Sequence, residues 1–215
     1  MSDSKSSRVI GLPTVCQQRI EHLLASGERH ILGLVAAPGA GKSTLAQAIQ
    51  AQFAEVVQVV PMDGFHLANS ELQRLGRRGR KGAPDTFDAA GYVNLLRRIR
   101  LQSGDEVVYA PEFRRDLEEA IAGAIAVLPQ TRLIVTEGNY LLLDEAPWSQ
   151  VRDVLDEVWY LDVPKGVRHA RLLSRHMHFG RSRDEALAWI ASTDEPNAVR
   201  IAQCRGRADV QVPWD

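Results

Sequence analysis

The stretch AAPGAGKST, residues 36–44, combines glycines, a lysine and hydroxyl groups at a spacing that suits phosphate. It matches the loop pattern G-x-x-x-x-G-K-[ST], except that Ala36 replaces the first glycine. Gly39 and Gly41 allow backbone N–H groups to turn inward around phosphate oxygens. Alanine fits the first position where φ is negative, so the segment still predicts a nucleotide site. The residues expected to contact the nucleotide are Pro38, Gly39, Ala40, Gly41, Lys42, Ser43 and Thr44.

Within this loop, Lys42 would reach the β- and γ-phosphates, and the Ser43 hydroxyl would bind Mg²⁺. Two carboxylates follow other apolar runs: VVPMDGFH carries Asp63, and LIVTEGNY carries Glu137. In open parallel sheets, ligands gather beyond the C-terminal strand ends, so both carboxylates should face the phosphate loop. One could accept a proton from a substrate hydroxyl, and the other could hold Mg²⁺ directly or through water.

A cationic segment, RHARLLSRHMHFGR (168–181), carries Arg168, Arg171 and Arg175 at helical spacing, so they share one face. Arginines that close over phosphates stabilise the charge that develops during phosphoryl transfer. The alternative is a solvated helix face. His176 and His178 are two residues apart and would point to different faces, which predicts surface histidines and no metal site.

A second basic run, RLGRRGRKG (74–82), has no interleaved aromatic residues, and the formal net charge of the chain is -1. These features argue against nucleic acid as a partner. We interpret the run as a mobile loop near anionic substrates.

The elements that must position these groups alternate along the chain. Five apolar runs are typical of buried strands: 30–37, 56–63, 132–138, 157–163 and 208–212. Helical periodicity lies at 43–53, 88–102, 166–179 and 182–192, with Asp88 as an expected N-cap. This order predicts an α/β fold with a parallel sheet covered by helices on both faces. Residues 116–129 stay ambiguous, because their propensities favour a helix but Gly123 weakens it.

The composition sets the remaining limits. The chain has 215 residues, of which 45% are hydrophobic and 25% charged, which is ordinary for a soluble globular domain. The two cysteines, Cys16 and Cys204, lie far apart in the sequence. Their spacing is not typical of metal ligands, and they indicate no disulfide framework. The N-terminal MSDSKSSR is polar, and no apolar run approaches membrane-spanning length. We therefore expect a single cytoplasmic domain over 1–215, with no membrane partner.

Taken together, the ordered motifs resemble the P-loop kinases of the uridine kinase, phosphoribulokinase and bacterial pantothenate kinase group. The likeness runs from Ile31 to about Val212, through PMDGFH, RKGAPDTFD, YAPEFRRD, TEGNYLLL, RHARLLSRH and PNAVRIAQCRGRAD. The combination is also similar to bacterial nucleoside/nucleotide kinase family proteins and to those described as fructose transport system kinases.

This resemblance implies a P-loop NTPase fold with a helical lid at about 165–185. It also implies ATP and Mg²⁺ as cofactors, and transfer of the γ-phosphate to a hydroxyl of a small molecule. Asp63 maps to the catalytic aspartate, Lys42, Arg171 and Arg175 to catalytic cations, and Ser43 and Glu137 to the metal. The residues expected at the acceptor substrate are Asp63, His66, Tyr109, Phe113, Arg114, Arg115 and Asn197. A homodimer is compatible with the family.

Arg114 and Arg115 stand where the family has a histidine near its Pro-aromatic segment. Such a pair could bind a substrate carboxylate or phosphate, or could pair with Asp116 or Glu112. The acceptor therefore stays open among a nucleoside, a pantothenate-like acid and a sugar or sugar phosphate. Neither an N-K-x-D motif of regulatory GTPases nor an ABC-type signature is present. The remaining alternative is a regulatory protein that binds nucleotide but phosphorylates no small molecule.

Overall fold

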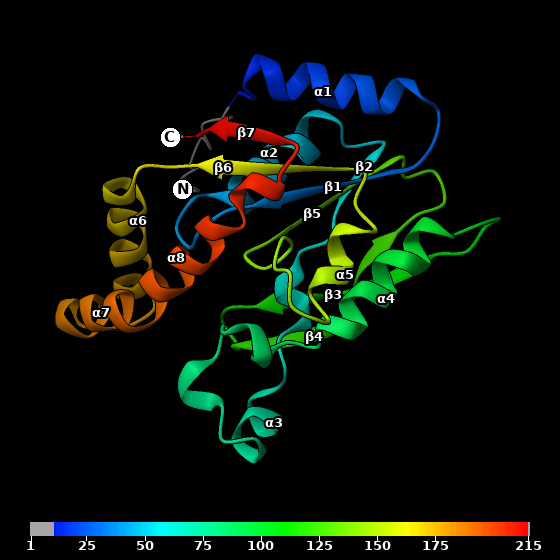
Figure 1. The fold of residues 1–215 in the computed structure, drawn as a ribbon. Coiled ribbons are helices and arrows are strands. Elements are labelled where there is room, and N and C mark those ends of the chain that lie inside the picture. Colours follow the sequence, from blue (N-terminus) through cyan, green and yellow to red (C-terminus); the bar gives the residue numbers. More distant parts are fainter. Residues whose placement is uncertain (1–10, 215) are drawn as a thin grey trace, which may run out of the picture.

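The computed structural model describes residues 11–214, in which a five-stranded parallel sheet forms the centre (Figure 1). Its strand order is β2-β5-β1-β6-β7. The five strands are β1 (His30–Val35), β2 (Val57–Val59), β5 (Leu133–Gly138), β6 (Glu157–Asp162) and β7 (Val210–Pro213). Each lies within or overlaps one of the five predicted runs. The predicted polar N-terminus, 1–8, lies outside the described residues.

Helices cover both faces of this sheet, as expected for a parallel sheet. One face is packed by α1 and α2, and the opposite face by α4, α5 and α8. The helices are α1 (Thr14–Ala25), α2 (Lys42–Gln52), α3 (Asn69–Arg74), α4 (Ala89–Arg100), α5 (Ser149–Arg152), α6 (Lys165–His178), α7 (Arg183–Trp189) and α8 (Glu195–Gln203). The Asp88 carboxylate accepts from the Gly91 N–H at 2.8 Å, which confirms the predicted N-cap of α4.

Strand β1 shows how the two faces arise from the sequence. Its side chains alternate, so Ile31 and Val35 join the cluster under α4, while Leu32 and Leu34 join the cluster under α2. Gly33 lies between them because a Cβ there would come within 2.8 Å of the Leu155 side chain.

Residues 116–129, which were ambiguous in the sequence, do not form a helix. They supply β4 (Glu119–Val127), which pairs antiparallel with β3 (Val108–Arg114) as a separate two-stranded sheet. The register shifts near Gly123, which adopts a φ of 69°. Gly123 therefore accommodates the irregularity in β4, because glycine adopts positive φ without a steric penalty.

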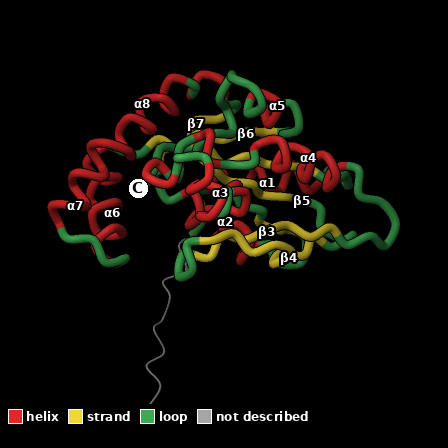
Figure 2. Tube along the Cα trace, turned by 90° about the horizontal axis from the view of Figure 1, so that it is seen from below, coloured by secondary structure: helices red, strands yellow, loops and turns green. Residues whose placement is uncertain are grey.

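The region expected to form a lid, about 165–185, contains α6 and the start of α7, and a π-helical turn (Ile190–Asp194) leads from α7 into α8. Ser182 and Glu185 form a capping box that starts α7. Seen from below, the α6–α7 pair and the β3–β4 hairpin lie on opposite sides of the molecule (Figure 2). No helix within residues 11–214 is long and apolar enough to cross a membrane.

Candidate active site

The phosphate loop has the backbone that its sequence predicts. Gly39 and Gly41 have φ values of 79° and 86°, and a Cβ at Gly39 would lie 2.7 Å from the Arg168 carbonyl oxygen. Ala36 does not have positive φ, since Glu118 is the one non-glycine residue that does within 11–214. Alanine therefore fits the first position of the loop, as expected. Helix α2 begins at Lys42, so its N-terminus points into the loop.

The Lys42 ammonium group is held in the loop by two oxygens. It donates to the Asn139 side chain at 2.6 Å and to the Ala36 carbonyl at 3.2 Å. Burial lowers the pKa of Lys42, although the nearby carboxylates of Glu137 and Asp63 oppose this. A desolvated cation of this kind gains strongly from an incoming phosphate.

The Ser43 hydroxyl donates to a Glu137 carboxylate oxygen at 2.7 Å. Glu137 is 6% exposed, and burial, followed by the charge of Asp63, raises its pKa. A serine oxygen and a buried carboxylate together form the hard-oxygen donor set that Mg²⁺ prefers. The pair therefore has the chemistry of a cation site that also meets the phosphate loop.

Asp63 lies in a short 3₁₀ turn (Met62–Phe65) that follows β2, and its carboxylate accepts from Arg115 Nη2 at 3.2 Å. The adjacent Gly64 does not have positive φ. Its small size is required because a Cβ would lie 2.3 Å from the Pro111 carbonyl of β3. The glycine thus lets the hairpin approach the turn, which brings Arg115 to Asp63.

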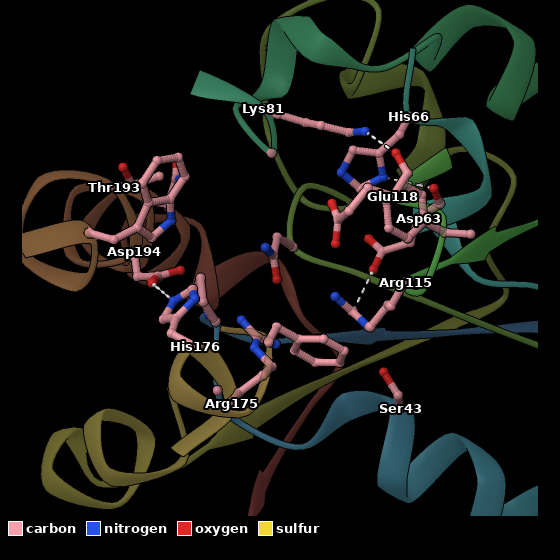
Figure 3. Close-up of a pocket in the computed structure, with 18 of the residues that line it drawn as sticks. Ser43, Asp63, His66, Lys81, Arg115, Glu118, Arg175, His176, Thr193 and Asp194 are labelled. Carbon is pink, nitrogen blue, oxygen red and sulfur yellow. Dashed lines mark hydrogen bonds and ion pairs between the residues drawn. The ribbon is translucent and has the colours of Figure 1, made fainter. Parts of the chain in front are cut away.

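The three lid arginines occupy different surroundings. Arg168 is buried, and its guanidinium contacts Glu195 at 3.4 Å and the Pro38 carbonyl at 3.4 Å. Arg171 Nη1 donates to the Ala40 carbonyl of the phosphate loop at 3.4 Å. Arg175 points into the cleft (Figure 3), where burial and the nearby Arg115 lower its pKa. Only Arg175 of these three lines the cleft.

His176 is not a surface histidine, contrary to the prediction. Its Nε2 lies 2.8 Å from a carboxylate oxygen of Asp194, and both side chains are largely buried. The π-helical turn carries Asp194 to this position, so the pair ties α6 to the start of α8. Residues 11–214 contain no group of three or more His, Cys, Asp or Glu side chains that could hold a metal ion.

These groups meet in a cleft of about 530 Å³ between the lid and the β3–β4 hairpin. The expected site residues that line it are Pro38, Gly39, Lys42, Ser43, Asp63, His66, Phe113, Arg115, Glu137, Arg175 and Asn197. Those that do not line it are Ala40, Gly41, Thr44, Tyr109, Arg114 and Arg171.

Tyr109 and Arg114 were expected at the substrate, but the hairpin directs them elsewhere. Tyr109 is 58% exposed, and Arg114 pairs with Asp116 at 3.2 Å outside the cleft. Arg114 is the last residue of β3, whereas Arg115 lies in the turn that follows it, so the end of the strand separates the two arginines.

Sequence reasoning missed several residues of the cleft. Asn139 comes two residues after Glu137 at the same strand end, which was a usable signal. Lys81 belongs to the basic run, which indeed reaches the cleft. Asn69, Glu118, Trp189 and Asp194 had no local signal, because they come together only through tertiary packing.

A family model described as phosphoribulokinase / uridine kinase matches residues 31–214. The chain belongs to this family. It is thus a P-loop kinase, a nucleotide-binding phosphotransferase that acts on small molecules, and membership of the family implies ATP as the nucleotide. The match covers the phosphate loop, the Asp63 turn, the Glu137 strand end and the lid.

Two curated relatives match most of this chain, and the first is named as a uridine kinase, whereas the second is described as uncharacterized. The chain is 36% identical over 192 residues to the "putative uridine kinase C227.14" of Schizosaccharomyces pombe, covering 85% of this chain and 81% of that protein. It is 35% identical over 189 residues to the protein YggC of Escherichia coli, covering 86% and 77%.

A solved structure described as a "putative fructose transport system kinase" from Silicibacter sp. TM1040 matches with a TM-score of 0.82 and 39% identity. That match covers 94% of this chain and all of the other. The YFH7 structure from Saccharomyces cerevisiae matches with a TM-score of 0.80 at 18% identity, which supports the fold alone. The expected P-loop α/β fold is confirmed.

Proposed function

We propose that this protein transfers the γ-phosphate of ATP to a hydroxyl of a small metabolite, with Asp63 as the general base. The observation that carries the proposal is the convergence of Lys42, Asp63 and the Ser43–Glu137 pair on one cleft from three strand ends. A protein that only binds nucleotide needs no proton acceptor opposite the phosphate loop in addition to the Ser43–Glu137 pair.

In the proposed reaction, the acceptor oxygen forms a bond to the γ-phosphorus, and the bond from that phosphorus to the β,γ-bridging oxygen breaks. The hydroxyl proton passes to the Asp63 carboxylate, and ADP leaves. Lys42 and the loop N–H groups hold the phosphates, while Arg175 faces the charge that develops during transfer. Mg²⁺ held by Ser43 and Glu137 would neutralise phosphate charge.

The experiment is to measure nucleotide affinity and single-turnover phosphorylation in one preparation of Asp63→Asn. The amide keeps the shape of the side chain but cannot accept the proton. We expect ATP affinity to change little and phosphorylation to fall roughly 10²–10⁴-fold, the usual worth of general-base catalysis.

If Asp63→Asn keeps wild-type phosphorylation, Asp63 is a structural residue and the proposed mechanism loses its base. If affinity and phosphorylation both vanish while the fold stays intact, Asp63 belongs to the metal–nucleotide site. The alternative is a regulatory protein that binds nucleotide. It predicts that the protein binds ATP but that no small hydroxyl compound raises the rate of ADP release.

A further inference from the structure

His66 presents a hydrogen-bond acceptor to the cleft beside the proposed base. Its Nδ1 lies 2.8 Å from the Asp63 carbonyl oxygen, which can only accept, so Nδ1 carries the proton. The ring contacts the rings of Phe87 and Phe113 in tilted arrangements, with centroid distances of 4.0 Å and 4.6 Å. Figure 3 shows it projecting into the cleft between Lys81 and Asp63.

The second nitrogen of this ring, Nε2, has no hydrogen-bond partner among residues 11–214. Burial lowers the pKa of His66, so the ring is neutral near pH 7 and Nε2 keeps a free lone pair. A lone pair that faces a substrate cleft calls for a donor on the substrate. A hydroxyl group other than the one that reacts would supply it.

Basic side chains also gather at the same end of the cleft. Three cations line it: Arg115 pairs with Asp63, Lys81 lies near the carboxylates of Glu119 and Glu118, and Arg78 is the third. Lys81 is held by the Asn69 side chain and the Glu118 carbonyl, which leave its charge in place. Arg78 pairs with no carboxylate among the described residues.

We propose that the acceptor is a polyhydroxylated anion, such as a sugar acid or a sugar phosphate. One hydroxyl faces Asp63, a second donates to Nε2 of His66, and the anionic group lies in the field of Arg78, Lys81 and Arg115. This inference rests on the proposed kinase function. It favours such anions over neutral sugars and over nucleosides.

The first test is a coupled ADP-release assay with Mg²⁺–ATP and acceptors paired by charge. D-Ribose 5-phosphate is compared with D-ribose, and D-gluconate with D-glucose, and uridine represents the nucleosides. We expect ADP release well above the acceptor-free rate with at least one anion and with none of the neutral compounds. Turnover of uridine or a neutral sugar at comparable kcat/KM would overturn the proposal.

The kinase proposal and this inference fail differently in that assay. If a neutral compound is phosphorylated, the kinase function stands and the acceptor class is wrong. If ATP binds but no anion of the panel raises ADP release, the class is again wrong. If the protein does not bind ATP, both proposals fall.

The second test isolates the hydroxyl contact through His66→Phe, which keeps an aromatic ring between Phe87 and Phe113 but removes Nε2. With the preferred anion we expect KM to rise roughly tenfold, the worth of one hydrogen bond, with kcat nearly unchanged. The deoxy analogue that lacks the second hydroxyl should show the same KM in both proteins. His66→Gln, which retains an acceptor oxygen, should recover part of the affinity.

A merely structural role for His66 would raise KM equally for the hydroxylated and deoxy acceptors, and that result would overturn the contact. The anion contact is tested by Arg78→Gln against the control Arg74→Gln, since Arg74 pairs with Glu71 and does not line the cleft. Only Arg78→Gln should raise KM for the anion. Equal KM values in both variants and the wild type would contradict an electrostatic role for Arg78.

Discussion

At the residue scale, burial disfavours the charged forms of two side chains in the cleft. Lys42 and Glu137 are both desolvated, and burial shifts each pKa toward the neutral form. Polyphosphate and Mg²⁺ carry the complementary charges. Burial of these two charged side chains therefore lowers the free energy of unfolding, and binding of the nucleotide and Mg²⁺ would raise it again.

Glu137→Gln tests that balance between stability and function. Because the folded-state pKa of Glu137 is raised, its ionisation opposes folding as pH rises through that pKa. The metal-free variant should therefore unfold at an equal or higher temperature than the wild type at pH 8, with the difference vanishing toward pH 4. Ser43 can still donate to the amide oxygen.

The same Glu137→Gln variant should need roughly tenfold more Mg²⁺ for half-maximal turnover, because a neutral amide is a weaker partner for a hard cation. Thermal melts from pH 4 to 8 and a Mg²⁺ titration measure the two effects. A lower melting temperature at pH 8 together with an unchanged titration would remove Glu137 from the metal site.

At the element scale, helix α6 carries two arginines that contact different parts of the site. Arg175 reaches the cleft, whereas Arg171 contacts the Ala40 carbonyl of the phosphate loop and does not line the cleft. We expect Arg175→Ala to lower kcat roughly 10²-fold with little change in ATP affinity, since it removes one preorganised donor. Arg171→Ala should mainly raise KM for ATP. Steady-state kinetics of both variants measure these changes. A wild-type kcat in Arg175→Ala would contradict a catalytic role for Arg175.

The base of the lid is tied to α8 through Glu195. Burial alone would raise the pKa of Glu195, but hydrogen bonds from Lys165 and His169, together with the charge of Arg168, lower it to about 2. A depressed carboxylate pKa stabilises the fold above the unfolded value and loses that contribution as pH falls through the folded value.

Glu195→Gln should therefore reduce the free energy of unfolding by about 2 kcal/mol at pH 7, and the difference should shrink between about pH 4.5 and 2. Urea denaturation at a series of pH values measures it. The matched control is Glu21→Gln on α1, whose carboxylate is exposed and, among the described residues, accepts a hydrogen bond only from the Gln17 side chain. A difference for Glu195→Gln that is independent of pH would contradict an electrostatic origin.

At the scale of the whole molecule, the cleft joins the sheet, the hairpin and the lid, so nucleotide binding should stabilise the entire fold. At a ligand concentration of 100 times Kd, binding adds about 2.7 kcal/mol. For a chain of this size we expect the melting temperature to rise by about 5–10 °C with Mg²⁺–ATP.

Lys42→Ala should fold normally and lose most of that rise, because the loop backbone remains but its cation is gone. Differential scanning fluorimetry with and without Mg²⁺–ATP measures the shift. An unchanged rise, together with normal turnover in Lys42→Ala, would refute the phosphate-loop assignment.

The sequence by itself determined the features that depend on a few neighbouring residues. The phosphate loop, the Asp88 cap and the placement of Asp63 and Glu137 after apolar runs are set by backbone conformation and local hydrogen bonding. Parallel strands bring their C-terminal ends to one edge, so the two carboxylates could be expected opposite the loop without knowledge of the strand order.

Only the tertiary structure decided the features that depend on contacts distant in sequence. Residues 119–127 become a strand because β3 supplies a partner, which overrides their helical propensity. The hairpin ends at Arg114, which contacts Asp116, and the turn that follows brings Arg115 to Asp63. His176 is buried because the π-helical turn brings Asp194 to it. The Arg115–Asp63 and His176–Asp194 contacts join residues 52 and 18 positions apart, and no local pattern encodes them.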